Sequence, residues 1–195
     1  MKEKIVRVTG YGFFCLSVEA FSNFLKEHKI KAKKLNTYFD KNRDILEESI
    51  KQGILLPLST IVSTRYVVEA GIAAKLSVFD SDWQEVLTLD NCNLTVGNDA
   101  AIWIGSLDGL DDWNSAEYEQ GDSISYQTMD GVTLFRSFKF NVKPGMYKVV
   151  VRGFKRKAPQ DHPAANFGFS FELRETTSLG SFTNPLIENV NIAKM

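Results

Sequence analysis

The chain has 195 residues, of which 44% are hydrophobic and 24% are charged, and its formal net charge is −1 at pH 7. This composition is that of an ordinary globular domain, which excludes a disordered or fibrous chain. No apolar run reaches the roughly 18 residues that span a bilayer, and the N-terminal sequence MKEKIVRVTG lacks the apolar core of a signal peptide, so a cytoplasmic protein is expected.

The N-terminal third of the chain predicts a mixture of strands and helices. Strands are indicated by apolar residues that alternate with polar ones, and helices by apolar residues at three- and four-residue steps. The expected elements are, in chain order, a strand over 5–8, helices over 17–28 and 35–52, and strands over 54–62 and 65–70. Gly53 is expected to stop the second helix, and Gly71 marks a boundary between a region over 1–71 and a domain over 72–195.

The rest of the chain predicts strands almost throughout. The expected elements are short strands over 76–79, 86–89, 94–96 and 101–104, a loop or short helix over 105–121, longer strands over 124–128, 132–140, 147–151 and 167–174, and an irregular tail after 176. Asp130-Gly131 is a hairpin signal and Pro144-Gly145 suits a type II turn, so the longer strands are expected to pair locally as an antiparallel meander. The predicted fold class is α+β: a C-terminal antiparallel, jelly-roll-like β-sandwich with an N-terminal helix and strand region.

Charge is distributed unevenly along the chain. Residues 76–131 contain twelve acidic residues and no Lys or Arg, whereas 1–75 carry thirteen basic and eight acidic residues and 132–195 carry ten and four. Two interpretations stay open: the acidic loops pair with basic strands of the same fold, or they form a surface that attracts a basic partner. In the second case the expected contact residues are Asp108, Asp111, Asp112, Trp113, Glu117 and Glu119, with the tryptophan as the aromatic anchor.

Most catalytic and cofactor chemistry has no pattern in this sequence. There is no glycine-rich phosphate loop, and His28, His162, Cys15 and Cys92 lack the spacing of a zinc motif, so no cofactor is expected and the cysteines are expected to be buried thiols. The basic cluster over 155–157 is expected to be a solvated strand end rather than a nucleic-acid site. Two alternatives remain: a carbohydrate- or calcium-binding β-sandwich module, and a hydrolase that uses Asp and Glu.

The segment from about 107 to 153 resembles the bacterial competence nuclease inhibitor and related β-sandwich proteins. The resemblance is carried by Asp112-Trp113, the acid-rich spacer to Gly121, the strand over 123–128 and the strand–turn–strand over 138–147, and it covers about a quarter of the chain. The chain also resembles small bacterial proteins that include immunity proteins of toxin systems. These resemblances imply a cytosolic protein that binds one partner and has no catalysis of its own. Together with the acidic stretch, they favour an immunity protein or inhibitor of a basic toxin or nuclease.

Overall fold

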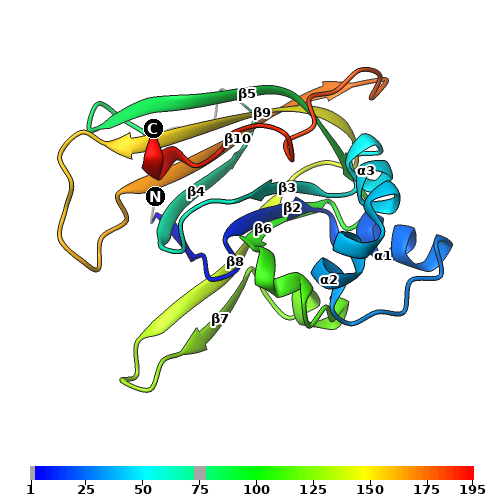
Figure 1. Cartoon of the computed structure of the whole chain (residues 1–195), viewed down its shortest axis with the longest axis horizontal. Coiled ribbons are helices and arrows are strands. Elements are labelled where there is room, and N and C mark those ends of the chain that lie inside the picture. The colour runs from blue at the N-terminus through cyan, green and yellow to red at the C-terminus, as the bar shows by residue number, and fades with distance from the viewer. Residues whose placement is uncertain (1–2, 73–77) are drawn as a thin grey trace.

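A computed structural model describes residues 3–72 and 78–195 of the chain (Figure 1). Its elements are, in chain order, β1 (Lys4–Arg7), β2 (Gly12–Leu16), α1 (Val18–Glu27), α2 (Leu35–Lys41), α3 (Arg43–Lys51), β3 (Leu56–Ser59), β4 (Arg65–Gly71), β5 (Trp83–Val96), β6 (Ala101–Ser106), η2 (Leu107–Leu110), η3 (Ser115–Glu119), β7 (Ser123–Gln127), β8 (Thr133–Asn141), β9 (Gly145–Arg156), β10 (Phe167–Thr176) and η4 (Ile192–Lys194). The strand predicted over 76–79 falls partly outside the described residues.

The strands form one sheet that curls into a nearly closed barrel (Figure 1). Their order is β3-β2-β6-β8-β1-β4-β10-β9-β5, with β7 paired to β8 outside this path. The two ends of this path are therefore β3 and β5. The gap between them is bridged where Thr95 of β5 donates its N–H to the carbonyl of Gly53 at 2.7 Å. It is also filled by the C-terminal segment, because Val190 and Ile192 are fully buried among the side chains of the barrel interior.

The predicted fold, an antiparallel jelly-roll-like β-sandwich with an N-terminal helix and strand region, is wrong. β4 runs parallel to β10, from Tyr66 opposite Phe167 to Gly71 opposite Glu172, and β1 lies between β4 and β8. Strands from both sides of Gly71 thus share one mixed sheet. The alternation of side chains identifies a strand but not its partner, and these partners lie far apart along the chain.

The predicted meander exists only in part. β7 and β8 form the hairpin predicted at Asp130-Gly131, but β8 and β9, which the segment around Pro144 connects, do not pair with each other. β8 pairs with β6, whereas β9 lies between β5 and β10. The strands predicted separately over 86–89 and 94–96 are one strand, β5, whose register shifts around Asn91 at a φ of 63°.

The predicted helices are present, but the second is divided. Ser17 caps α1 by accepting a backbone N–H, as its position before the helix predicts. The helix predicted over 35–52 breaks at Asn42, whose φ of −128° and ψ of 66° are not helical and whose amide donates to the carbonyl of Tyr38 at 2.7 Å. Gly53 follows α3 at a φ of 69°, as expected of a stop residue. None of the helices in the described part of the chain is long and apolar enough to cross a bilayer.

Two hydrophobic cores lie on opposite sides of β2 and β6. Inside the barrel, the rings of Phe13, Tyr66 and Phe169 pack with centroids 5.4 to 5.7 Å apart. Cys15 and Cys92 are free thiols buried in the same interior, as predicted. The second core joins the other face of β2 and β6 to the helices. The helices therefore lie outside the barrel (Figure 1).

Candidate functional site

The six residues predicted to bind a partner lie on the segment from η2 to η3, but two of them are engaged by the fold. Asp108 accepts a hydrogen bond from the Ser106 hydroxyl, and its carboxylate lies 3.8 Å from the guanidinium of Arg136. Trp113 is half-buried, and its ring packs edge-on against Phe21 with centroids 4.8 Å apart. Both side chains therefore hold this segment against the core.

The other four predicted residues lie in different surroundings. Asp111 lines a hollow beside α2 and α3, and its Oδ1 is buried with no hydrogen-bond partner among the described residues. Asp112 and Glu117 are exposed, whereas Glu119 lines a hollow between η3 and α1. The structure thus does not gather the six into one site.

Three hollows lie next to one another on the helical side of the molecule, with volumes of about 470, 260 and 930 Å³. The first and second share Glu19 and Asn23, and the second and third share Gln52, Ile54 and Thr95. We call them together the acidic groove. Among the described residues, its acidic side chains are Glu19, Glu27, Asp44, Glu47, Glu48, Asp99 and Glu119, and its basic ones are Lys51 and Lys139.

Two of these carboxylates are fixed at the N-terminus of α1. Asp99 accepts the Ser17 hydroxyl at 2.8 Å and the backbone N–H of Glu19 at 3.1 Å. Glu19 in return accepts the backbone N–H of Asp99 at 3.1 Å. A helix N-terminus favours negative charge, so this exchange holds both carboxylates at the groove. Gly97 makes it possible, because a Cβ at that position would lie 2.6 Å from a carboxylate oxygen of Glu19.

Among the described residues, no carboxylate of the acidic groove forms an ion pair with Lys or Arg. Within the described residues, Glu27, Asp44, Glu47 and Glu119 take part in no ion pair within 4.0 Å. Glu48 lies 3.8 Å from a ring nitrogen of His28. The acids of α3 share one face of the helix because they lie three and four residues from Asp44, and Lys51 lies at the end of the same face.

Apolar and aromatic side chains form the floor of the groove. In the first hollow, Trp103 and Tyr118 meet edge-on with centroids 4.9 Å apart, and burial raises the pKa of the Tyr118 phenol above its usual range. Ile54, Met146 and Phe182 line the third hollow. An acidic rim above an apolar floor suits Lys or Arg, because the aliphatic stem packs on apolar surface while the charged head group reaches the carboxylates.

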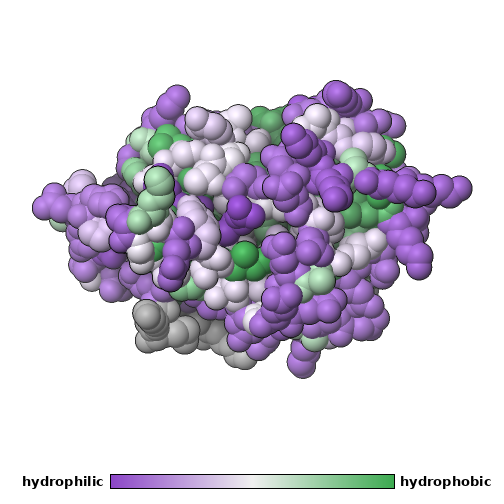
Figure 2. All heavy atoms as spheres, turned by 90° about the horizontal axis from the view of Figure 1, so that it is seen from below, coloured by the Kyte–Doolittle hydropathy of each residue, from purple (hydrophilic) through white to green (hydrophobic). Residues whose placement is uncertain are grey.

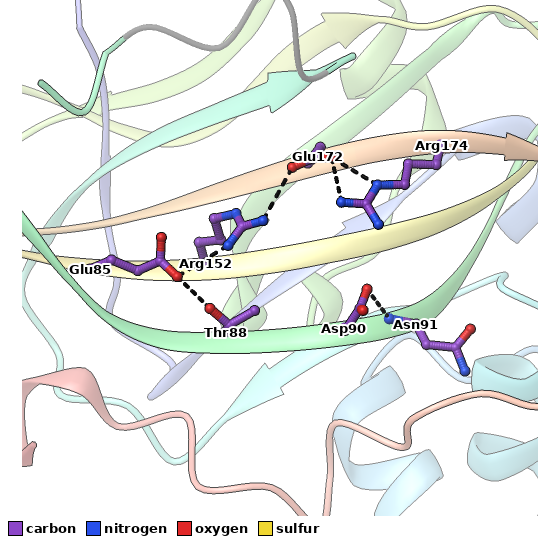
Figure 3. Close-up of polar contacts among 7 residues, drawn as sticks. All are labelled: Glu85, Thr88, Asp90, Asn91, Arg152, Glu172 and Arg174. Atoms are coloured by element: carbon purple, nitrogen blue, oxygen red, sulfur yellow. Dashed lines mark hydrogen bonds and ion pairs between the residues drawn. The ribbon is translucent and has the colours of Figure 1, made fainter.

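Carboxylates on the outer face of the sheet are paired instead (Figure 3). Glu172 of β10 lies 2.8 Å from Arg174 and 3.5 Å from Arg152 of β9, and Arg152 also contacts Glu85 of β5 at 3.1 Å. We call these four residues the ion-pair ladder. Glu85 belongs to the acid-rich stretch over 76–131, so part of that charge is neutralised within the fold.

The basic cluster at the end of β9 is also engaged by the fold. Lys155 donates to the main-chain oxygen of Met195 at 2.7 Å. Arg156 lies over the Trp83 ring at 4.3 Å and donates to the carbonyl of Ala165 at 3.1 Å. These contacts order the strand end.

The face seen in Figure 2 is largely hydrophilic, and its hydrophobic areas are small and separate. Among the described residues, no group of three or more His, Cys, Asp or Glu side chains could hold a metal ion. Comparisons with protein-family models, with curated proteins and with solved structures returned no match.

Sequence reasoning missed most of the acidic groove because of where its acids lie in the chain. Those of α1 and α3 fall within residues 1–75, where basic residues outnumber acidic ones by thirteen to eight. One signal could have found the α3 part: Asp44, Glu47 and Glu48 recur at three- and four-residue steps, which places them on one helix face.

Proposed function

We propose that this protein is a non-catalytic binding protein, an immunity protein or inhibitor that holds a basic toxin or nuclease at the acidic groove. The observation that carries the proposal is the charge of the groove, where the described residues place seven carboxylates and two lysines. The proposal places the protein in the cytoplasm and requires no cofactor.

Neighbouring carboxylates that outnumber the nearby cations repel one another and create a negative potential in the space between them. A partner that brings Lys or Arg into this space relieves the repulsion, and long-range attraction raises its rate of association. A nuclease binds phosphate with basic residues, so an acidic surface that occupies those residues also blocks the substrate. The groove therefore combines fast capture with inhibition.

The rigidity of the groove supports the same proposal. Glu19 and Asp99 are held by backbone hydrogen bonds before any partner arrives, so little side-chain freedom is lost when they bind. The apolar floor adds contact area for the stems of long basic side chains. We expect Lys or Arg side chains of the partner to lie along the groove, over both α1 and α3.

The proposal is tested by capturing partners from an extract of the native host with three versions of the protein. The first is unchanged, the second carries Glu27→Gln and Glu47→Gln in the groove, and the third carries Asp112→Asn and Glu117→Gln outside it. All four side chains are exposed, so both variants lose two surface charges. A basic protein should bind the unchanged protein and the third version, and bind the groove variant about tenfold more weakly or worse.

The captured protein is then assayed for its own activity, with nuclease substrates first. We expect its activity to fall when the unchanged protein is added and to recover with the groove variant. Equal capture by all three versions, or equal loss in both variants, would contradict the assignment of binding to the groove.

A further inference from the structure

The hairpin of β7 and β8 projects from the barrel and leaves one strand edge open (Figure 1). Among the described strands, β7 pairs with β8 alone. Tyr126, Met129 and Val132 of this hairpin are exposed. An open edge carries backbone N–H and C=O groups that can pair with another strand. The hairpin therefore offers both unpaired backbone groups and apolar side chains to a partner.

The sequence of β7 lacks the charged residues and the Pro that commonly protect an edge strand. Such strands commonly carry Lys, Pro or inward-pointing charges, which prevent pairing with a second molecule. Residues 123–129 contain no charged residue and no Pro. Because this stretch is neutral, no like-charged side chains within it oppose the approach of a second copy.

We propose that β7 pairs antiparallel with β7 of a second copy of this chain, with the two-fold axis at Ser125. In this register Ser125 lies opposite its own copy, Ile124 lies opposite Tyr126, and Ser123 lies opposite Gln127. A β-branched residue opposite an aromatic one is a favourable cross-strand pair, and the two-fold symmetry forms that pair twice. Asp122 lies opposite Thr128 rather than opposite another carboxylate, and Lys139 of its own chain lies 3.8 Å from it.

The neighbouring symmetric registers are less favourable. An axis at Tyr126 places Asp122 opposite Asp130, which brings two like charges together. An axis at Ile124 places Tyr126 opposite Asp122 and loses the pair of apolar side chains. The axis at Ser125 is therefore the one that the sequence selects.

The contact is small, and it forms and dissociates readily. β7 has five residues, and its pairing with β8 shifts register between Ile124 and Ser125. Stable interfaces bury about 1,200 to 2,000 Å² in total, which a pair of such short strands does not reach. We therefore expect a weak dimer whose population rises with concentration across the micromolar range.

Sedimentation velocity at increasing concentration tests the proposal. The unchanged protein should pass from monomer to dimer, whereas Ser125→Lys should weaken the dimer several-fold because the two new charges lie opposite each other. Ser123→Lys is the matched control, because it lies opposite Gln127 and keeps two charges apart. A protein that is monomeric at every concentration overturns the proposal, as does a dimer that Ser125→Lys leaves unchanged.

A disulfide test fixes the register. Directly opposite residues have Cα atoms about 4.5 to 5.5 Å apart, which lies within disulfide range, so Ser125→Cys should form a covalent dimer with diamide. The two Ser123 positions lie about 13 Å apart, four residues along the strand, so Ser123→Cys should not. The native cysteines are buried and do not compete. Equal cross-linking of both variants overturns the register, and absence of cross-linking in Ser125→Cys overturns the pairing.

Discussion

In the ion-pair ladder, Glu85 and Glu172 each contact the guanidinium of an arginine on a strand. In the acidic groove, by contrast, the carboxylates of α1 and α3 have no Lys or Arg partner among the described residues. The ladder lies on the sheet, where residues far apart in the chain are brought side by side by strand pairing (Figure 3). The groove lies where helices pack on the barrel and leave one charged face to solvent.

This difference indicates that acidic residues of one chain can serve either stability or binding, depending on whether the fold gives them cationic partners. On the sheet, the buried Glu172 has two arginine partners, Arg174 on its own strand and Arg152 on β9, so loss of this carboxylate would leave cations without their partner and destabilise the fold. In the groove the acids outnumber the lysines and form no ion pair with them among the described residues, so this charge contributes little to folding and remains available to a partner. Ladder mutations should therefore change stability, and groove mutations should change binding.

Alkaline pH should lower the free energy of unfolding more than any substitution below. The ladder and the groove are therefore best compared near neutral pH. Burial raises the pKa of Cys92 to about 12 and also raises the pKa of Cys15 and of Tyr66. These groups ionise more easily in the unfolded chain, so their stabilisation is complete below the ordinary thiol pKa of about 8.5 and is lost as the pH rises toward the folded-state values. In that pH range each buried thiol lowers the free energy of unfolding by up to about 1.4 kcal/mol per pH unit.

Circular dichroism with urea, measured from neutral to alkaline pH, should show a free energy of unfolding that falls steeply above about pH 9. Cys92→Ala should make that slope shallower. A free energy of unfolding that stays level up to the folded-state pKa of about 12 would contradict the burial of these groups.

Replacing Glu172, the acid that contacts both arginines of the ladder, should give the next largest loss in the free energy of unfolding. Glu172→Gln leaves Arg174 without its 2.8 Å partner and Arg152 with Glu85 alone, so we expect a loss of about 2 kcal/mol in the free energy of unfolding. Glu47→Gln, which removes a groove acid, should change it by less than about 0.5 kcal/mol. Urea unfolding of both variants measures the contrast. Equal effects would abolish the distinction between the two regions.

The shape of the groove can be changed without changing the charge of its lining. Lys148 donates to the carbonyls of Leu179 and Ser181 at 2.8 and 2.6 Å and to the side chain of Asn93 at 2.8 Å, and so anchors the segment that forms one groove wall. Lys148→Met should cost about 1.5 kcal/mol of stability and should weaken partner binding although every groove acid remains. Unchanged binding would show that the C-terminal wall is not part of the site.

Salt gives the smallest effect and should act on the ladder only. Glu47 lies three residues after Asp44 but four residues from both Arg43 and Lys51, so Glu47→Gln removes repulsion and attraction together and should change the free energy of unfolding by less than about 0.3 kcal/mol, with or without about 1 M salt. The loss of stability caused by Glu172→Gln should become smaller in about 1 M salt, because salt screens the attraction between the carboxylate and its arginines. Thermal melts at two ionic strengths compare the variants, and a salt response of the same size in both would contradict the account.

The sequence predicted local features better than pairings. The cap at Ser17, the stop at Gly53 and the turn at Asp130-Gly131 depend on neighbouring residues, and each is present as predicted. The parallel pairing of β4 with β10 depends on contacts between residues far apart in the chain, which no local pattern encodes.

The same limit applies to the candidate site. The acid-rich loop was visible as a run of charge, but the groove joins acids of α1 and α3 to Asp99 and Glu119 only after folding. Counting charges along the chain also does not show which acids have a cationic partner. Glu85, for example, pairs with Arg152, which lies on another strand. Location in space, rather than composition, separates the ladder from the groove.

The most direct test of the central claim is an NMR titration of the unchanged protein with a short lysine-rich peptide as the probe. If the acidic groove binds basic segments, the amide signals that shift should be those of α1, α3 and the turn around Gly97, and the Glu27→Gln, Glu47→Gln variant should show smaller shifts at the same peptide concentration. Shifts centred on Asp112 and Glu117, or spread evenly over the surface, would contradict it.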